Sequence, residues 1–148
     1  MTAHVLFVCT GNICRSPLAE HLARRRWAGQ DIIVSSAGTH GLPGLHATTT
    51  MVAAGTELGV DLSRHRSRDI TAVHQPDLAL CMEEHQVAAV QARFPTMNRD
   101  RIRLLDTAGI IDPYGATLSR YRITALQIKT AIDALDIEEW IRPPPDDR

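Results

Sequence analysis

A short segment near the start of the chain places a thiol and a guanidinium where they could act on a phosphoryl group. Its residues are Cys9, Thr10, Gly11, Asn12, Ile13, Cys14, Arg15 and Ser16. Successive backbone N–H groups of such a loop can point inward, and an arginine can donate two hydrogen bonds to one oxyanion. A field that attracts an anion also stabilises a thiolate. The segment therefore predicts a phosphate-binding loop with Cys9 as an ionised nucleophile and Gly11 allowing the tight backbone turn.

A candidate proton donor lies far along the chain, at Asp112. Expelling an oxygen leaving group from phosphorus needs an acid, which a carboxyl group can supply. Pro113 restricts the backbone beside Asp112, and Tyr114 can offer a flat wall to an aromatic substrate. Because Asp-Pro is also a common turn signal, both interpretations of Asp112 remain open on this evidence alone.

Alternating strand and helix patterns are expected to position these residues. The apolar run at residues 5–9 predicts a strand buried on both faces that ends at Cys9, and Ser16 followed by Pro17 predicts a helix start. Further strands are predicted at residues 32–34, 77–81 and 101–105, and further helices at about residues 46–58, 83–94 and 118–141. This order predicts a doubly wound α/β fold with a four-stranded parallel sheet, helices on both faces, and a binding site after the first strand.

Length and composition limit the other possibilities. The chain has 148 residues, 44% of them hydrophobic, which fits one domain; we predict that it spans residues 1–142, with a loose tail at 143–148. Sixteen Lys and Arg residues against 17 Asp and Glu residues create no general field for nucleic acid. No apolar run near the start approaches the roughly 20 residues that a membrane span needs.

The cysteine and histidine content predicts a cytoplasmic protein without a cofactor. Three cysteines, an odd number, argue against a secreted disulfide scaffold and favour a reducing compartment. The seven histidines show no metal-binding spacing, so neither a metal nor another cofactor is expected. The sequence leaves the oligomeric state open.

The segment around Cys9 resembles the signature loop of the low-molecular-weight protein-tyrosine phosphatases. Similar segments follow in the family's order at residues 35–39, 65–68, 80–84 and 112–114. The resemblance extends over nearly the whole chain apart from the tail. It implies hydrolysis of phosphotyrosine on proteins or peptides through a phosphocysteine intermediate.

The resemblance also implies roles for individual residues. It makes Cys9 the nucleophile, Arg15 the phosphate ligand, and Asp112 the general acid that later activates water. It implies a hydrogen-bonded network that keeps the loop in shape, formed by Asn12, Ser16, Ser36 and His65. Without the resemblance, His65 would be placed on a surface loop, because arginines flank it.

Two further roles concern the surroundings of the nucleophile. The resemblance suggests a reversible disulfide between Cys9 and Cys14 that would protect the nucleophile from over-oxidation. The substrate wall is expected to consist of Tyr114 together with His40 and Leu42, although that second loop lacks the aromatic residue that often lines a phosphotyrosine cleft.

Three alternatives remain open at the level of sequence. A protein-arginine phosphatase is favoured by Gly115 after Tyr114 and opposed by Ile13, where that branch has Thr. An arsenate reductase would need another thiol shortly after Cys81, and none follows it. A domain that only binds phosphorylated peptides is opposed by the presence of both Cys9 and Asp112.

Overall fold

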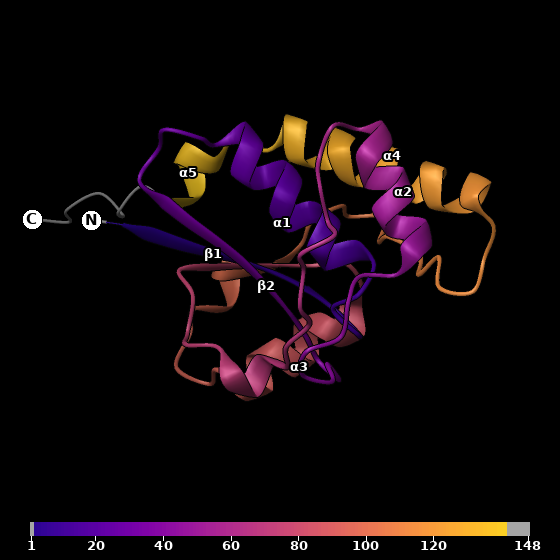
Figure 1. The fold of residues 1–148 in the computed structure, drawn as a ribbon. Helices are drawn as coiled ribbons and strands as arrows, with labels where there is room; N and C mark the ends of the chain where they lie inside the picture. The colour runs from indigo at the N-terminus through magenta and orange to yellow at the C-terminus, as the bar shows by residue number, and fades with distance from the viewer. Residues whose placement is uncertain (1, 142–148) are drawn as a thin grey trace, which may run out of the picture.

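The computed structural model describes residues 2–141, which form one parallel sheet between layers of helices (Figure 1). The strands are β1 (Ala3–Cys9), β2 (Ile32–Gly38), β3 (Leu78–Cys81) and β4 (Ile102–Leu104). Their order is β2-β1-β3-β4, and all neighbouring pairs are parallel. The predicted fold class is confirmed. The predicted tail at residues 143–148 lies outside the described residues.

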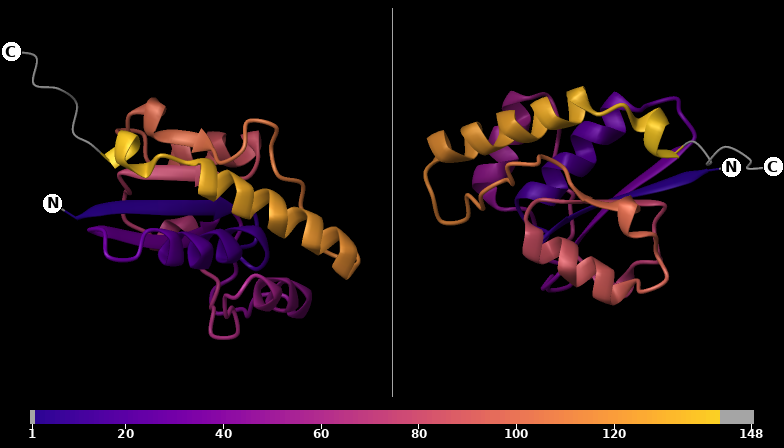
Figure 2. Two further views of the ribbon diagram at one scale, coloured as in Figure 1. Left: turned by 90° about the horizontal axis from the view of Figure 1, so that it is seen from above. Right: turned by 180° about the vertical axis from the view of Figure 1, so that it is seen from behind.

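Helices cover both faces of the sheet. They are α1 (Arg15–Arg26), α2 (Thr49–Glu57), α3 (Glu84–Arg93), α4 (Leu118–Ala134) and α5 (Ile137–Ile141). Short 3₁₀ turns, η1 (Ile70–Ala72) and η2 (Arg99–Arg101), precede β3 and β4. The views in Figures 1 and 2 show α3 on one face and the other four helices on the opposite face.

The central strand β1 is anchored in two hydrophobic clusters. Successive side chains of a strand point to opposite faces, so Phe7 joins the cluster under α1 and α4 while Leu6 and Val8 join the cluster under α3. All three are fully buried. Cys9 lies at the carboxyl end of this strand and is itself buried.

The loop after β1 lies where a ligand site is expected in such a sheet. The sequence neighbours β2 and β3 flank β1 on opposite sides, so the strand order reverses at β1. In open α/β sheets, ligands bind at this reversal, outside the carboxyl ends of the strands.

Strand β2 continues beyond its predicted end at residue 34. Ser35 and Ser36 remain in the ladder opposite Leu6 and Phe7, and both are buried. Their hydroxyl groups are hydrogen-bonded, Ser35 to the ring of His4 and Ser36 to Glu20 and Asn12, so burial leaves neither hydroxyl unsatisfied.

Three helix boundaries also differ from the predictions. The helix predicted from about residue 46 begins at Thr49, because the Thr48 hydroxyl accepts a hydrogen bond from the backbone of Met51. The helix predicted over 118–141 is two helices. Leu135 and Asp136 separate them, and the Asp136 carboxylate accepts a hydrogen bond from the backbone N–H of Glu138 near the start of α5. Helix α1 begins at Arg15 without a side-chain cap, since the Ser16 hydroxyl contacts Cys9 instead.

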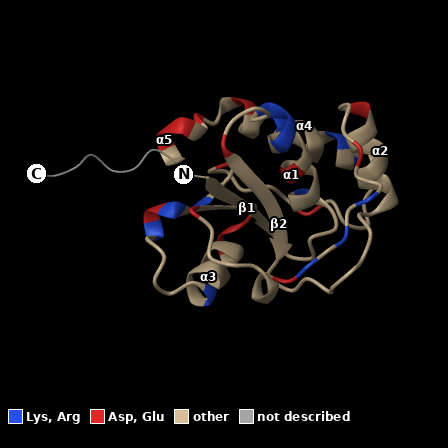
Figure 3. Cartoon of the chain, turned by 60° about the vertical axis from the view of Figure 1, so that its left-hand side comes forward, with Lys and Arg blue, Asp and Glu red and all other residues tan. Residues whose placement is uncertain are grey.

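Charged residues of both signs are interspersed along the chain in Figure 3, in keeping with the formal net charge of −1. No helix within residues 2–141 is long and apolar enough to cross a membrane. Over the same residues, no three His, Cys, Asp or Glu side chains are grouped as a metal site would require.

Candidate active site

The sulfur of Cys9 makes two hydrogen-bonding contacts within its own loop. The backbone N–H of Asn12 donates to Sγ at 3.3 Å, and the hydroxyl of Ser16 lies 2.9 Å from it. That hydroxyl oxygen accepts a hydrogen bond from the Asn12 side chain at 2.8 Å, which leaves the Ser16 proton free to point at the sulfur. Two hydrogen-bonding groups therefore face the sulfur at the start of α1, the end of a helix that interacts favourably with anions.

Asn12 organises the loop from a left-handed backbone conformation. Its φ is 57°, a region that Asn tolerates better than most residues with a side chain. Its side-chain NH₂ donates to both Ser16 and Ser36, at 2.8 and 2.9 Å. Its side-chain oxygen accepts from the backbone N–H of Arg68 at 3.0 Å, and its backbone carbonyl accepts from Nε2 of His65 at 2.7 Å. The structure thus brings together all four residues that the resemblance assigned to loop support.

The network ends at Glu20, a residue that the sequence analysis did not single out. Glu20 is buried and accepts a hydrogen bond from the Ser36 hydroxyl at 2.8 Å. The hydrogen bonds branch at Asn12. Its side-chain NH₂ donates to Ser16 on one side and to Ser36 on the other, and Ser36 in turn donates to Glu20. Glu20 is also paired with Arg24 at 3.0 Å, a spacing that in sequence indicates only a surface pair on a helix.

Gly38 allows the end of β2 to lie against the loop. A Cβ atom there would be 2.4 Å from the carbonyl oxygen of Thr10, far closer than atoms can approach. The next two residues donate backbone hydrogen bonds back to the loop, Thr39 to Cys9 at 3.0 Å and His40 to Thr10 at 2.9 Å. The shape of the loop is therefore fixed from β2 as well as from within.

Arg15 is buried beneath the loop. Only 1% of the residue is exposed. Its Nη1 donates to the carbonyl oxygen of Ile110 at 2.6 Å and lies 3.0 Å from a carboxylate oxygen of Glu83. Its Nη2 lies 3.7 Å from Asp112, while its Nε is buried without a hydrogen-bond partner. The sequence analysis missed Glu83 as an individual contact.

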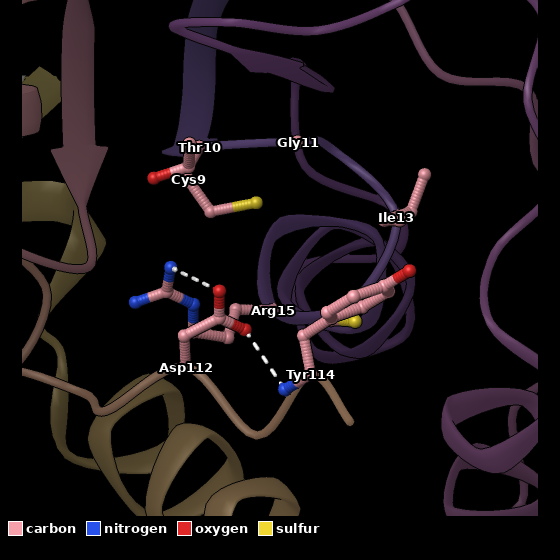
Figure 4. Close-up of a pocket in the computed structure, with 8 residues that line it drawn as sticks. Cys9, Thr10, Gly11, Ile13, Arg15, Asp112 and Tyr114 are labelled. Atoms are coloured by element: carbon pink, nitrogen blue, oxygen red, sulfur yellow. Dashed lines mark hydrogen bonds and ion pairs between the residues drawn. The ribbon is translucent and has the colours of Figure 1, made fainter. Parts of the chain in front are cut away.

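Asp112 reaches the same pocket from a loop before α4. One carboxylate oxygen accepts a hydrogen bond from the backbone N–H of Tyr114 at 3.0 Å, and the other lies near Arg15. Its side chain is 47% exposed, so a bound substrate or water can reach it. Figure 4 shows Asp112, Arg15 and Cys9 converging on one space.

The pocket has a polar base and partly apolar walls. It is lined by Cys9, Thr10, Gly11, Ile13, Cys14, Arg15, Asp112 and Tyr114. The predicted wall residue Tyr114 is in this set, whereas His40 and Leu42 are not; both lie exposed on the following loop. Ile13, predicted only as part of the phosphate-binding loop, also lines the pocket (Figure 4).

The second loop cysteine has its own partners. Cys14 Sγ lies 3.5 Å from the Thr48 hydroxyl and 3.6 Å from the Tyr121 hydroxyl, and all three described cysteines are free thiols. Burial raises the pKa of Cys14, against a smaller opposing effect of these two contacts. The disulfide with Cys9 stays a prediction. Tyr121, predicted as core, is indeed buried.

Cys81 is confirmed as a core residue. It is fully buried at the end of β3, and burial strongly raises the pKa of its thiol. A protonated, inaccessible thiol cannot serve as the relay that an arsenate reductase would need.

His65 is buried, although its flanking arginines alone would indicate a surface position. Burial lowers the pKa of His65 and outweighs the hydrogen bond to Asn12, which raises it. Below the ordinary histidine pKa of about 6.5, the unfolded chain therefore binds more protons than the folded chain, and stability rises with pH. We expect the free energy of unfolding to fall between about pH 7.5 and about pH 5.5, and to fall less in His65→Gln, as measured by urea denaturation at each pH.

Two variants test the specificity of this effect. Burial also lowers the pKa of His4, so His4→Gln is expected to remove a separate share of the same pH dependence. The exposed His40, replaced by Gln, is the matched control. If His65→Gln keeps the parent's full pH dependence, His65 is not a source of it.

A four-stranded parallel sheet whose first strand delivers a thiol to an amide-lined loop with a buried arginine defines a class of cysteine-dependent phosphatases. Residues 4–139 match the family model of the low molecular weight phosphotyrosine protein phosphatases, and the chain belongs to this family.

Three known proteins show the extent of the similarity. The low molecular weight protein-tyrosine-phosphatase Etp of Escherichia coli K12 is 40% identical over 115 residues, covering 74% of this chain and 76% of Etp. The tyrosine phosphatase amsI of Erwinia amylovora is 27% identical with a TM-score of 0.81 and covers 90% of both chains. The YwlE arginine phosphatase of Geobacillus stearothermophilus is 28% identical with a TM-score of 0.75, covering 88% of both chains.

Proposed function

We propose that this protein hydrolyses phosphotyrosine on proteins or peptides, with Cys9 as the nucleophile, Arg15 as the phosphate ligand and Asp112 as the general acid. The observation that carries the proposal is the convergence of these three side chains on one pocket, with two donors directed at the Cys9 sulfur. Membership of the family supports it. A phosphorylated protein is the partner that this chemistry requires.

In the first step, the Cys9 thiolate attacks phosphorus and the bond from phosphorus to the tyrosyl oxygen breaks. The proton of Asp112 passes to that oxygen, so the product leaves as a neutral phenol and phosphocysteine remains. Negative charge on the three phosphoryl oxygens is stabilised by the loop amides and Arg15, most strongly in the transition state.

In the second step, Asp112, now a carboxylate, removes a proton from a water molecule that attacks the phosphocysteine. The sulfur–phosphorus bond breaks, inorganic phosphate forms, and Cys9 returns as a thiolate. Asp112 recovers its proton from the water, so the cycle closes with no metal ion as a reactant.

The walls of the pocket support an aryl substrate. Ile13 and the exposed ring of Tyr114 offer apolar surface beside the Cys9 sulfur. His40 and Leu42 would have to contact more distant parts of the substrate.

The free thiols of Cys9 and Cys14 support a cytoplasmic location, where thiols remain reduced.

Substrate comparison and trapping test this proposal together. The kcat/KM for a phosphotyrosine peptide is expected to exceed that for the same peptide carrying phosphoarginine by at least about 100-fold. Rapid acid quenching during turnover of the phosphotyrosine peptide is expected to capture phosphate on Cys9. A preference for phosphoarginine would replace the proposed substrate, and phosphate binding without turnover of either peptide would reduce the protein to a binding domain.

Asp112→Asn tests the assignment of the acid. An amide cannot donate the proton, so kcat for a phenyl phosphate with a poor leaving group is expected to fall by about 10²–10³-fold. For an aryl phosphate whose phenol is strongly acidic, the fall should be less than about 10-fold, because that leaving group needs little protonation. The measurement is a plot of log kcat against leaving-group acidity for both proteins.

Asp106→Asn is the matched control, since Asp106 lies in the same irregular segment but not in the pocket lining. Equal losses of Asp112→Asn on both substrates would show that Asp112 acts on structure or binding rather than on the leaving group.

A further inference from the structure

The carboxylate of Glu83 occupies one side of the Arg15 guanidinium. A carboxylate oxygen of Glu83 lies 3.0 Å from Nη1, and the same nitrogen donates to the carbonyl oxygen of Ile110 at 2.6 Å. Two acceptors therefore hold Nη1. In Figure 4, this nitrogen points away from Cys9 and Asp112.

The other edge of the guanidinium, formed by Nε and Nη2, has donors without a close acceptor in the described part of the chain. Nε is buried without a hydrogen-bond partner among the described residues, and Nη2 has only the longer ion pair with Asp112 at 3.7 Å. A buried donor without a partner is costly, which indicates that this edge is completed by a ligand. Neighbouring Nε–H and Nη2–H donors match two oxygens of one phosphoryl group.

We propose that Glu83 is a positioning residue for Arg15. By holding Nη1, it fixes the rotation of the guanidinium so that Nε and Nη2 face the phosphoryl group attacked by Cys9. This inference rests on the proposed function, because it concerns the same phosphoryl group.

Glu83 is itself held against the loop. The side-chain oxygen of the fully buried Gln86 accepts from the backbone N–H groups of Met82 and Glu83, both at 2.9 Å. The side-chain nitrogen of Gln86 donates to the hydroxyl of Thr10 at 3.1 Å. The start of α3 is thus connected to both ends of the phosphate-binding loop, through Gln86 to Thr10 and through Glu83 to Arg15.

Glu83 is also suited to remain a carboxylate. Partial burial raises its pKa, but hydrogen bonds from Arg15 and His85 outweigh burial, and the net direction is downward. The carboxylate therefore stays available to Arg15 over the range in which the enzyme would work.

The test compares Glu83→Gln and Glu83→Ala with Glu84→Gln. Glu84 is an exposed carboxylate one residue further along that is not part of the ion pair with Arg15. For each protein, kcat and KM are measured with an aryl phosphate, together with the inhibition constants of inorganic phosphate and of vanadate, which mimics the transition state. Binding of both anions is also measured by protection of Cys9 from alkylation, which needs no turnover.

If the Nε and Nη2 donors of Arg15 are misplaced, the transition state loses more stabilisation than the bound substrate does. In Glu83→Ala, kcat is expected to fall by about 10–100-fold and vanadate binding to weaken by a similar factor. The affinity for phosphate should change by less than about 3-fold. Loss of the Glu83 carboxylate leaves Arg15 less well positioned, but it also removes a negative charge that repels phosphate, and the two effects offset each other. Glu83→Gln keeps an oxygen acceptor for Nη1 and should lose less, while Glu84→Gln should match the parent.

Two results would overturn the proposal. One is a kcat and a vanadate affinity within about 3-fold of the parent in both Glu83 variants. The other is an equal weakening of phosphate and vanadate together, the mark of a general loosening of the site. If Glu83→Ala does not fold, Glu83→Gln decides alone: a loss of more than about 3-fold in kcat and vanadate affinity supports the proposal, and a smaller loss overturns it. Absence of hydrolysis by the parent would instead refute the proposed function, and the protection experiment would still report on Arg15.

Discussion

Cys9→Ser is expected to reduce turnover of a phosphotyrosine peptide by about 10⁴-fold or more. The serine hydroxyl stays protonated at neutral pH and is a much weaker nucleophile than a cysteine sulfur, so the attack on phosphorus is largely lost. Because Ser also fits the buried position of Cys9, the variant should fold and bind phosphate. The measurements are kcat/KM, phosphate affinity by calorimetry and thermal stability.

Cys14→Ser is the matched control for a thiol in the same loop. Cys14 also lines the pocket, but its sulfur contacts Thr48 and Tyr121. Its replacement is expected to cost less than about 10-fold in kcat/KM. Near-normal turnover by Cys9→Ser would refute a mechanism through phosphocysteine, and equal losses in both variants would mean that the loop tolerates no substitution at all.

The sequence predicted the part of the site that is local in the chain. An apolar run followed by a glycine-containing loop and a helix start is a continuous pattern, so β1, the phosphate-binding loop and α1 could be placed from neighbouring residues alone. The prediction of Asp112 as the general acid depended on the family resemblance. Nothing in the sequence around Asp112 indicates that it lies beside residues about a hundred positions earlier in the chain.

The parts that sequence could not predict are contacts between distant segments. Glu20 and Glu83 are charged residues on or beside predicted helices, where a solvent-exposed position is the ordinary expectation. Glu20 is buried and Glu83 is partly buried, and each has a partner from another element, Ser36 for Glu20 and Arg15 for Glu83. Without the family resemblance, His65 would have been misplaced for the same reason. Its flanking arginines indicate a surface position, whereas its ring donates a hydrogen bond to the backbone carbonyl of Asn12.

The errors in element boundaries have a related cause. Ser35 and Ser36 indicate a strand end by composition, yet they continue β2 because their hydroxyls find partners in the core. Asp136 divides the predicted last helix because its side chain satisfies the start of α5. Hydrogen bonding of single polar side chains, rather than hydrophobic periodicity, decides each of these positions.

Arg15→Lys is expected to lower kcat/KM by about 10³-fold although it keeps the positive charge. A lysine ammonium is a point charge and cannot direct two fixed donors at two phosphoryl oxygens. The substitution also removes the partner of Glu83 and the donor to the Ile110 carbonyl, so the new side chain is drawn toward those acceptors and away from the phosphoryl group. The loss should appear mainly in kcat and in vanadate affinity, with phosphate binding reduced by less than about 10-fold.

Arg24→Lys is the control for Arg15→Lys, since Arg24 pairs with the supporting residue Glu20 but does not line the pocket. It should keep kcat/KM within about 3-fold of the parent. If Arg15→Lys also retained kcat/KM within about 10-fold, positive charge alone would account for the role of Arg15, and the open edge formed by Nε and Nη2 would have no part in binding the transition state. A loss confined to KM would contradict the expected fall in kcat, because it would mean that Arg15 binds the substrate and the transition state equally.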